Sequence, residues 1–309
     1  MPISRSGHLK RPFFFRSIVT WQHEEGIVYE LHESDRIRLS NFIEKNYGIQ
    51  MPPEKKILLQ TRLQKRAIHL GYPSLHLYIN YLFSPDGQAA ELDQFSTIVS
   101  THKTEFFREP KHFTLLHGTI LPDLTSENTL GTDQTLVTWS CASSTGEEVY
   151  SIAMTVCDFF RKHNNRSPLF KAIGTDISEN IVEFARRGIY HGPLLDSIPA
   201  EYRHYMMKSR DPARNAIRPV PELRSHTDFR PQNLMDEKYR VQKGIHVIFC
   251  RNVLIYFNRQ TQESILRKLV TMLATGGYLI IGHSETLSGA DLPLRQIQLT
   301  IYKKTGDPA

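Results

Sequence analysis

The residues best suited to chemistry follow predicted β-strands in the second half of the chain. The run C-A-S-S-T-G-E-E at 141–148 comes directly after a strand predicted over 135–142. Its small residues allow a ligand to approach the backbone, and a helix predicted over 147–161 begins beside them. The two acids of this run would repel a pyrophosphate and suit an ammonium or a sulfonium group. A helix cap at Thr145, with the acids favouring the helix dipole, explains the same residues equally well.

An acid also ends the next predicted strand. Asp176 lies in G-T-D-I-S, where a strand predicted over 169–177 gives way to a helix that Ser178 caps. In nucleoside-binding α/β folds, an acid at this place holds ribose hydroxyls. An aspartate that caps the helix is the alternative interpretation.

A third loop follows the apolar strand predicted over 245–250. Arg251 and Asn252 leave that strand, and Tyr256 shares a face with Asn252 if the segment turns helically. Methyltransferases that modify adenine usually carry an N-P-P-Y type motif here. This chain lacks that motif, which counts against a nucleic-acid substrate.

Strands and helices alternate from residue 134 onward, and this alternation would position the three loops. It predicts an open α/β sheet with helices on both faces, in which ligands bind beyond the carboxyl ends of the strands. Residues 190–235 interrupt the alternation with prolines and charges, which indicates an inserted subdomain. The last strand is expected over 295–302.

The first third of the chain shows a helical pattern instead. Leu59, Leu63, Ala67 and Leu70 recur at helical spacing, and no strand pattern appears before residue 134. A small helical domain is therefore expected.

Composition fits a globular protein with an acidic partner. The 309 residues are 40% hydrophobic and 23% charged, with a net charge of +6. Residues 1–75 carry 12 basic and 7 acidic side chains, and residues 203–230 carry 7 and 3. No apolar run is long enough to span a bilayer and no signal peptide is recognisable, so a cytoplasmic protein is expected. The three cysteines and the scattered histidines lack ligand spacing, so neither a disulfide nor a metal site is expected.

Taken together, these segments resemble the chemotaxis receptor methyltransferase family, the CheR-type protein-glutamate O-methyltransferases. The resemblance covers about residues 30–303. Its strongest blocks are T-H-K-T-E-F-F-R-E-P-K-H-F (101–113), W-S-C-A-S-S-T-G-E-E-V-Y-S-I-A-M (139–154), G-T-D-I-S (174–178) with A-R-R-G-I-Y (185–190), F-C-R-N-V-L-I-Y-F (249–257) and G-H-S-E-T-L (282–287).

The resemblance implies an α/β fold, with an N-terminal all-helical domain and a Rossmann-like class I methyltransferase domain that carries a small inserted β subdomain. It also implies S-adenosyl-L-methionine as cofactor and S-adenosyl-L-homocysteine as product. The expected boundaries are a flexible tail over 1–28, the helical domain over 29–116, a linker over 117–133, and the methyltransferase domain over 134–309 with its insertion at about 195–230.

The resemblance further implies the residues of the site. Arg108 and Tyr256 would be catalytic and lie nearest the transferring methyl, while Asp176 would hold the adenosine ribose. The cofactor-binding residues would be His102, Thr104, Arg108, Glu148, Asp176, Asn233, Leu234, Cys250 and Arg251. Histidine at 102 departs from the family, in which asparagine is expected. Residues 203–226 contain no glycine, so the glycine-bearing loop that grips a receptor's C-terminal peptide is not expected.

The implied reaction is an in-line attack on the sulfonium methyl by a glutamate carboxylate of a chemoreceptor. Because glutamate has a pKa of about 4.3, it is ionised at neutral pH and needs no general base. Lys55, Arg62 and Arg66 lie within roughly 40° on one helix and would dock the acidic methylation helices of the receptor. A solvated basic face is the alternative.

Two other functions compete with this interpretation. One is a nucleic-acid methyltransferase, suggested by the basic charge alone. The other is a non-catalytic S-adenosylmethionine-binding signalling adaptor. A monomer that reaches the membrane only through its receptor is expected, with no nucleic-acid partner.

Overall fold

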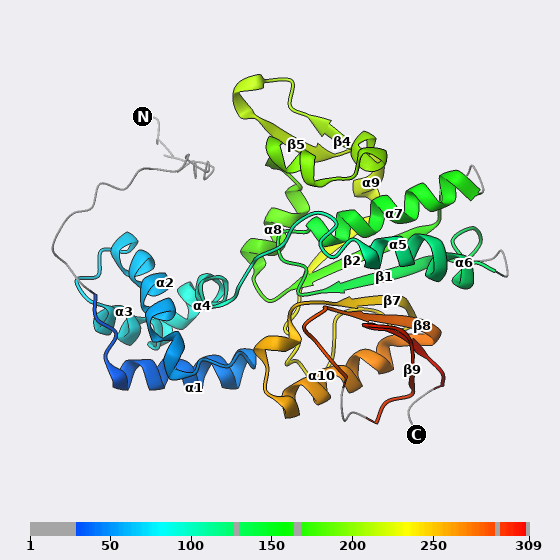
Figure 1. The fold of residues 1–309 in the computed structure, drawn as a ribbon. Helices are drawn as coiled ribbons and strands as arrows, with labels where there is room; N and C mark the ends of the chain where they lie inside the picture. The colour runs from blue at the N-terminus through cyan, green and yellow to red at the C-terminus, as the bar shows by residue number, and fades with distance from the viewer. Residues whose placement is uncertain (1–28, 127–129, 164–167, 288–290, 307–309) are drawn as a thin grey trace, which may run out of the picture.

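The computed structural model describes residues 29–126, 130–163, 168–287 and 291–306. A helical domain lies beside a larger α/β domain, and a small second sheet stands on the α/β domain (Figure 1). The tail predicted over 1–28 lies outside the described residues. No described helix is both long and apolar enough to cross a bilayer.

The helical domain forms around the apolar positions that repeat at helical spacing. Leu59, Leu63 and Ala67 are buried on one face of the helix, whereas Leu70 ends the helix and is 36% exposed. Serine hydroxyls cap two of the helices, since Ser74 accepts from the amide of Leu77 and Ser84 from that of Gly87. The helices are α1 Glu33–Tyr47, α2 Lys56–His69, α3 Leu75–Leu82 and α4 Pro85–Val99, with a 3-10 turn at Pro53–Lys55.

The α/β domain is built on a seven-stranded sheet in the order β6-β2-β1-β7-β8-β10-β9. The first five strands in this order, β6, β2, β1, β7 and β8, run parallel. Strand β10 pairs antiparallel with both β8 and β9. The strand order reverses at β1. Strands β2 and β6 are added on one side of β1, and the chain then crosses to the other side of β1 to form β7. The strands are β1 Leu136–Cys141, β2 Phe170–Asp176, β6 Thr227–Pro231, β7 Ile245–Cys250, β8 Leu273–Ile281, β9 Leu294–Gln298 and β10 Ile301–Lys304.

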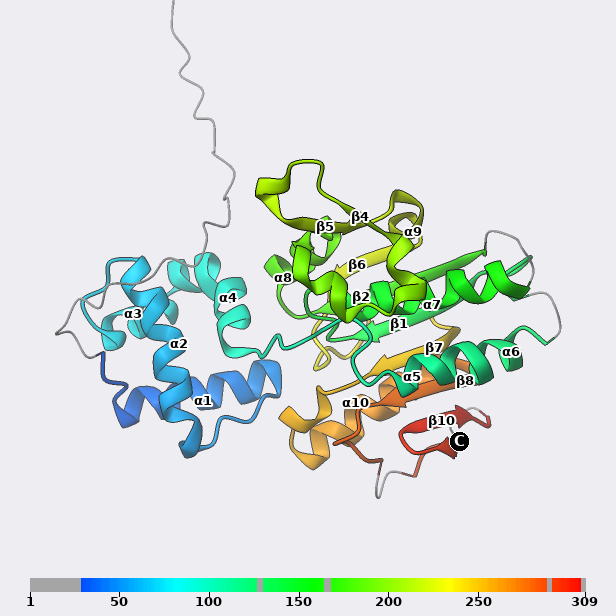
Figure 2. The same cartoon turned by 45° about the horizontal axis from the view of Figure 1, so that its top comes forward.

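Helices cover both faces of this sheet, as the alternating pattern predicted. Helices α7 and α8 share one hydrophobic core with the strands, and α10 packs into a second core on the other face (Figures 1 and 2). The end of α8 is set by Gly188, whose φ of 60° is left-handed. These helices are α7 Glu147–His163, α8 Glu179–Arg187 and α10 Arg259–Met272.

The inserted subdomain is a three-stranded antiparallel sheet in the order β3-β5-β4. Its last strand ends at Pro219, and α9 Pro221–Ser225 then leads into β6. Strand β6 lies inside the range that the sequence pattern assigned to the insertion, yet it is a parallel edge strand of the main sheet. The strands are β3 Tyr190–His191, β4 Met206–Lys208 and β5 Ala216–Pro219.

Two further segments differ from the prediction. The stretch expected as a linker over 117–133 begins inside a helical segment that runs over α5 Lys111–Leu115, a π-helix Leu116–Ile120 and α6 Leu121–Leu124. Leu116 and Ile120 of this segment are buried in the core that also contains α7. The single strand predicted over 295–302 is a hairpin, because a turn at Leu299 and Thr300 separates β9 from β10.

The two domains are joined on two sides. On one side, Asp93 of α4 accepts a hydrogen bond from the amide of Glu179 at 2.7 Å, at the start of α8. On the other side, the Asn233 side chain donates to the Asn46 carbonyl at 2.7 Å, and the Gln50 amide donates to the Tyr256 carbonyl at 2.8 Å. Figure 2 shows α4 facing α8 across this junction.

Candidate active site

A cavity of about 270 Å³ lies between the two joints, beyond the carboxyl ends of β1, β2 and β7. This is the point where the strand order reverses, which is where open α/β sheets bind ligands. Helix α2 and the segment before it supply part of the wall. The segment 100–110 and the loops after the three strands supply the rest.

The loop after β1 is shaped so that its backbone faces this cavity. Ala142 and Ser144 have positive φ values of 52° and 50°, and both line the cavity. Gly146 has a φ of 96°, and a Cβ there would lie 3.0 Å from the Ala185 Cβ. Small residues are therefore needed for two reasons: the loop passes close to α8, and its backbone must stay accessible from the cavity.

Asp176 holds this loop in place from the end of β2. Its Oδ2 accepts from the Ser144 amide at 2.9 Å, and its Oδ1 accepts from the Ser178 amide at 3.3 Å. Ser178, not Asp176, caps α8, because its hydroxyl accepts from the Ile181 amide. Burial raises the pKa of the Asp176 carboxyl, against the opposing effects of His102 and of these amides. The carboxylate thus lies at the cavity wall without serving as the helix cap.

The two acids that open α7 have different surroundings. Glu147 accepts from the Thr145 hydroxyl at 2.6 Å, and burial raises its pKa. Glu148 lines the cavity instead. Its Oε1 accepts from the Ser140 hydroxyl at 2.7 Å and its Oε2 from Arg251 Nη1 at 2.8 Å. The sequence pattern did not distinguish the two acids, but only Glu148 lines the cavity.

Arg251 connects three of the blocks that the sequence singled out. Its side chain is fully buried, and its Nη2 lies 3.1 Å from Glu109 Oε2 and donates to the Arg108 carbonyl at 2.5 Å. With Glu148 on Nη1, one guanidinium ties together the segment 100–110, the start of α7 and the end of β7. Partial burial raises the pKa of Glu109, but Arg251 and Asn252 outweigh it and lower the pKa overall.

Glu285 is a buried residue whose role sequence reasoning missed. Its carboxylate accepts four backbone N–H bonds, from Asn252, Val253, Leu254 and Gly282, at 2.6–2.9 Å. It thereby fixes the turn after β7, where Asn252 has a φ of 56°. The sequence did contain a signal for this role, because Glu285 is an acid that follows the apolar strand β8 within the block G-H-S-E-T-L.

The structure brings most of the predicted cofactor residues to the cavity. Those that line it are His102, Thr104, Arg108, Glu148, Asp176, Asn233, Leu234 and Arg251. Cys250 does not line it, because this residue is fully buried at the end of β7. Its thiol interacts with Cys141, which together with burial raises its pKa.

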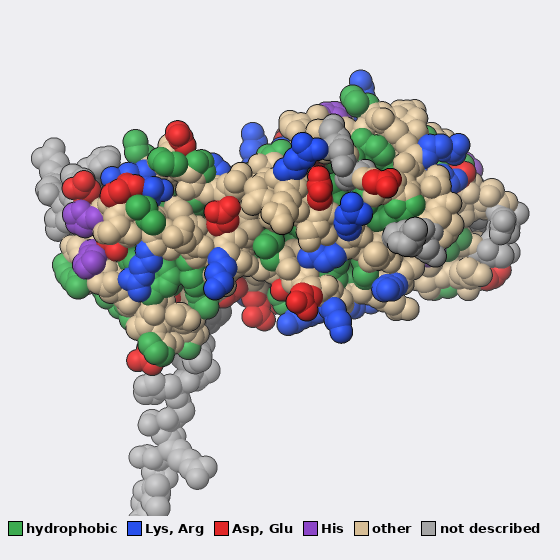
Figure 3. Space-filling view, turned by 90° about the horizontal axis from the view of Figure 1, so that it is seen from below, with side chains coloured by type: hydrophobic (Ala, Val, Ile, Leu, Met, Phe, Trp, Pro, Cys, Tyr) green, Lys and Arg blue, Asp and Glu red, His purple; other side chains and the backbone are tan. Residues whose placement is uncertain are grey.

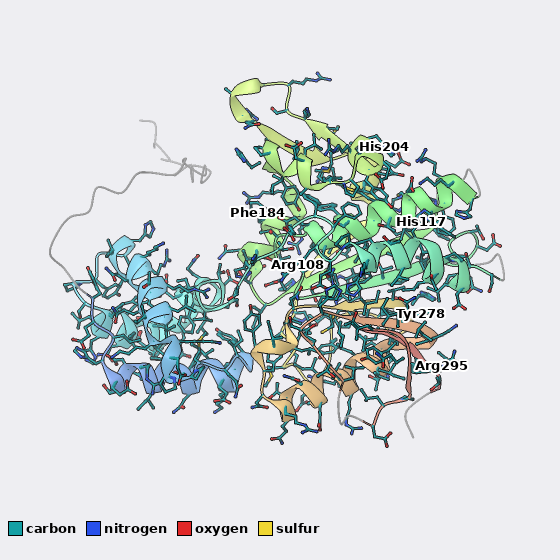
Figure 4. All side chains as sticks on the ribbon, in the orientation of Figure 1. Arg108, His117, Phe184, His204, Tyr278 and Arg295 are labelled. Carbon is teal, nitrogen blue, oxygen red and sulfur yellow. The ribbon has the colours of Figure 1, made fainter. Side chains whose placement is uncertain are left out.

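The two residues predicted to be catalytic also line the cavity. Arg108 is half-buried, and its Nη1 donates to the Lys103 carbonyl at 2.8 Å. Figure 4 shows Arg108 between the helical domain and the sheet. Tyr256 closes the 3-10 turn Leu254–Tyr256, with the Lys55 Nζ 5.8 Å from its ring centroid.

The residues predicted to dock a substrate are separated in the structure. Lys55 and Arg62 line the cavity, whereas Arg66 pairs with Glu91 at 2.6 and 2.8 Å inside the helical domain. Arg62 Nη1 donates to three carbonyls at the end of α4, on Ile98, Val99 and Ser100. Both arginines are therefore engaged within the protein rather than extended into solvent.

Glu109, His112 and His283 form the one group of described residues with metal-ligand atoms within 4.8 Å of one another. The oxygen of Glu109 that faces both histidines is the one paired with Arg251. Because a guanidinium already supplies the positive charge there, these residues fit an internal ion pair better than a metal. The expectation of no metal site stays a prediction.

Comparisons with known proteins agree with this geometry. The family described as "CheR methyltransferase, all-alpha domain" matches residues 35–97, and "CheR methyltransferase, SAM binding domain" matches residues 102–303. A chemotaxis protein methyltransferase of Borreliella burgdorferi is 33% identical over 92% of this chain and 99% of its own. One of Escherichia coli is 35% identical over 87% of this chain and 90% of its own.

These matches confirm the predicted fold class and S-adenosylmethionine as the cofactor. The predicted enzyme class, an S-adenosylmethionine-dependent chemotaxis protein methyltransferase, is confirmed as well. A cavity lined by acids and small residues at the reversal of strand order, and two family matches that span both domains, lead to one assignment: the chain belongs to the CheR methyltransferase family.

Proposed function

We propose that this enzyme transfers a methyl group from S-adenosyl-L-methionine to glutamate side chains of chemoreceptors and leaves S-adenosyl-L-homocysteine. The products on the receptor are glutamyl methyl esters. The observation that carries the proposal is the cavity, in which acids suited to a cofactor and cations suited to a carboxylate share one space.

The cofactor supplies an electrophilic methyl on a sulfonium, and the residues of this chain would hold it by charge and hydrogen bonds. Asp176 would accept from the ribose hydroxyls at the end of β2. Glu148, fixed by Ser140 and Arg251, would face the ammonium group. Asn233 and Leu234 would flank the adenine, and His102 and Thr104 would close the cavity from the side of the segment 100–110.

The acceptor carboxylate would enter beside Arg108 and Tyr256. A glutamate is ionised at neutral pH, so these residues need only position it, exclude water and balance its charge. Arg108 would attract the carboxylate, and the Tyr256 hydroxyl would donate a hydrogen bond to it. Lys55, close to the Tyr256 ring, would act with Arg62 on the acidic surface around the acceptor.

The proposed partners are the cytoplasmic methylation helices of chemoreceptors. The enzyme would work in the cytoplasm as a monomer and meet the membrane only through its receptor, with no nucleic-acid partner. Arg66 has a reduced part in docking under this proposal, because its charge is already matched by Glu91.

The test is transfer of labelled methyl from the cofactor to receptor-containing membranes, followed by a mild alkali wash. Base-labile label on the receptor is the expected result, because esters hydrolyse in alkali. Arg108→Gln and Tyr256→Phe should lower turnover far more than cofactor affinity measured by calorimetry. Cofactor binding without receptor labelling would favour a non-catalytic adaptor, and unchanged turnover in both variants would remove their catalytic assignment.

A further inference from the structure

Two apolar side chains at the cavity are unusually open to solvent. Leu58 of α2 is 43% exposed and Ile255 of the turn after β7 is 49% exposed, and both line the cavity. Ile57, next to Leu58 in the sequence, is 75% exposed. A single exposed aliphatic residue is ordinary, but here exposed apolar residues from both domains line the same cavity.

Both sides of this opening are held rigidly. Helix α2 is anchored to the end of α4 by Arg62, and the turn that carries Ile255 is anchored by the Glu285 carboxylate. The Gln50 amide bonds the Tyr256 carbonyl at 2.8 Å and so joins the two sides directly. The apolar surface is therefore formed before a partner arrives, which reduces the entropy lost on binding.

Positive charge lies on the same opening. Lys55 and Lys103 line the cavity, and neither ammonium has an ion-pair partner among the described residues. On the face seen from below, hydrophobic and basic side chains lie side by side over the helical domain, with acidic side chains and histidines among them (Figure 3). Such a surface complements an amphipathic helix that carries both carboxylates and apolar side chains.

We propose that Leu58 and Ile255 form an apolar rim that packs against the apolar side chains neighbouring the acceptor glutamate on a receptor helix. This inference rests on the proposed function and adds a determinant of substrate choice to it. The cations attract an acidic helix from a distance, and the rim adds an apolar contact beside the acceptor glutamate once the helix has docked. The contribution of the rim is not screened by salt, unlike that of the lysines.

The rim is tested with Leu58→Ser and Ile255→Ser, compared with Ile68→Ser as a matched control. Ile68 also lies on α2 and is 48% exposed, but it does not line the cavity. Each rim variant should raise the KM for the receptor about fivefold, since burying half an aliphatic side chain is worth about a factor of that size. The increase should persist at high salt, with unchanged cofactor affinity and melting temperature, and the control should match the wild type.

The possible outcomes separate the rim from the proposed function. Receptor labelling by the wild type with unchanged KM in both rim variants would overturn the rim alone. An equal loss of cofactor affinity would also overturn it, because the side chains would then belong to the cofactor site. No receptor labelling by the wild type would overturn the proposed function and the rim with it.

Discussion

Replacing Arg251 by methionine should destabilise the enzyme more than any exposed substitution, because it removes the cation from between two acids. The guanidinium is fully buried, 2.8 Å from Glu148 and 3.1 Å from Glu109. Removing one partner of a buried charge cluster costs about 3–5 kcal/mol. For a domain of this size, each kcal/mol lowers the melting temperature by about 2–4 °C, so a fall of roughly 6–20 °C is expected.

The loss should also depend on pH. In the wild type the pKa of Glu109 is lowered, so its contribution to stability is present above its unfolded pKa and is lost as the pH falls through the folded one. Without Arg251, only Asn252 and His283 oppose the effect of burial on Glu109, so its pKa should rise from the wild-type position and its ionisation should favour folding less. The gap in melting temperature between Arg251→Met and the wild type should therefore widen from pH 4.5 to pH 7.5.

Two further variants make the reasoning refutable. Arg251→Lys should restore little, because one ammonium cannot replace two nitrogens that serve different partners. Glu109→Gln combined with Arg251→Met should recover part of the stability by removing one unpaired carboxylate. Scanning calorimetry and cofactor titration check both variants. A full rescue by lysine, or a pH-independent loss, would show that packing rather than charge dominates at this site.

Three further changes should follow from other contacts. Glu285→Gln leaves two of four backbone donors without an acceptor and should cost about 2–5 kcal/mol in urea unfolding. Burial lowers the pKa of His112 to about 4, so stability falls as the pH drops from about 6.5 to 4, and His112→Gln should flatten that slope in melts taken across this range. Gly174→Ala would place a Cβ 2.7 Å from Phe229 and should cost about 1–3 kcal/mol, whereas the Cβ of Gly118→Ala meets nothing within 4 Å in a helical segment and should raise the melting temperature slightly.

The order of strands and helices could be predicted because local pattern and tertiary structure agree over most of the chain. The apolar run at β7 and the helical spacing of Leu59, Leu63 and Ala67 are examples. Strand β6 was missed because it is an edge strand and follows directly on the insertion. Its burial alternates weakly, and only its parallel pairing with β2 defines it.

Residues of the candidate site could be predicted where their position next to a strand or helix in the sequence determines where they lie. Asp176 ends a strand and Glu148 lies in the first turn of the helix that follows another strand. Both positions can be recognised in the sequence, so their place at the carboxyl edge of the sheet could be predicted. Contacts between distant segments could not be anticipated. No sequence pattern shows that Arg66 finds Glu91, or that Glu285 gathers the amides of the turn after β7.

The double joint around the cavity has a thermodynamic consequence. Asp93 accepts a hydrogen bond from α8 on one side, and Asn233 donates one to Asn46 on the other, while residues of both domains line the cavity. A ligand held there acts as an additional contact between the domains, and its binding energy is shared by both. At a hundred times its dissociation constant, such a ligand adds about 2.7 kcal/mol of stability. Saturation with cofactor should therefore raise the melting temperatures of both domains together.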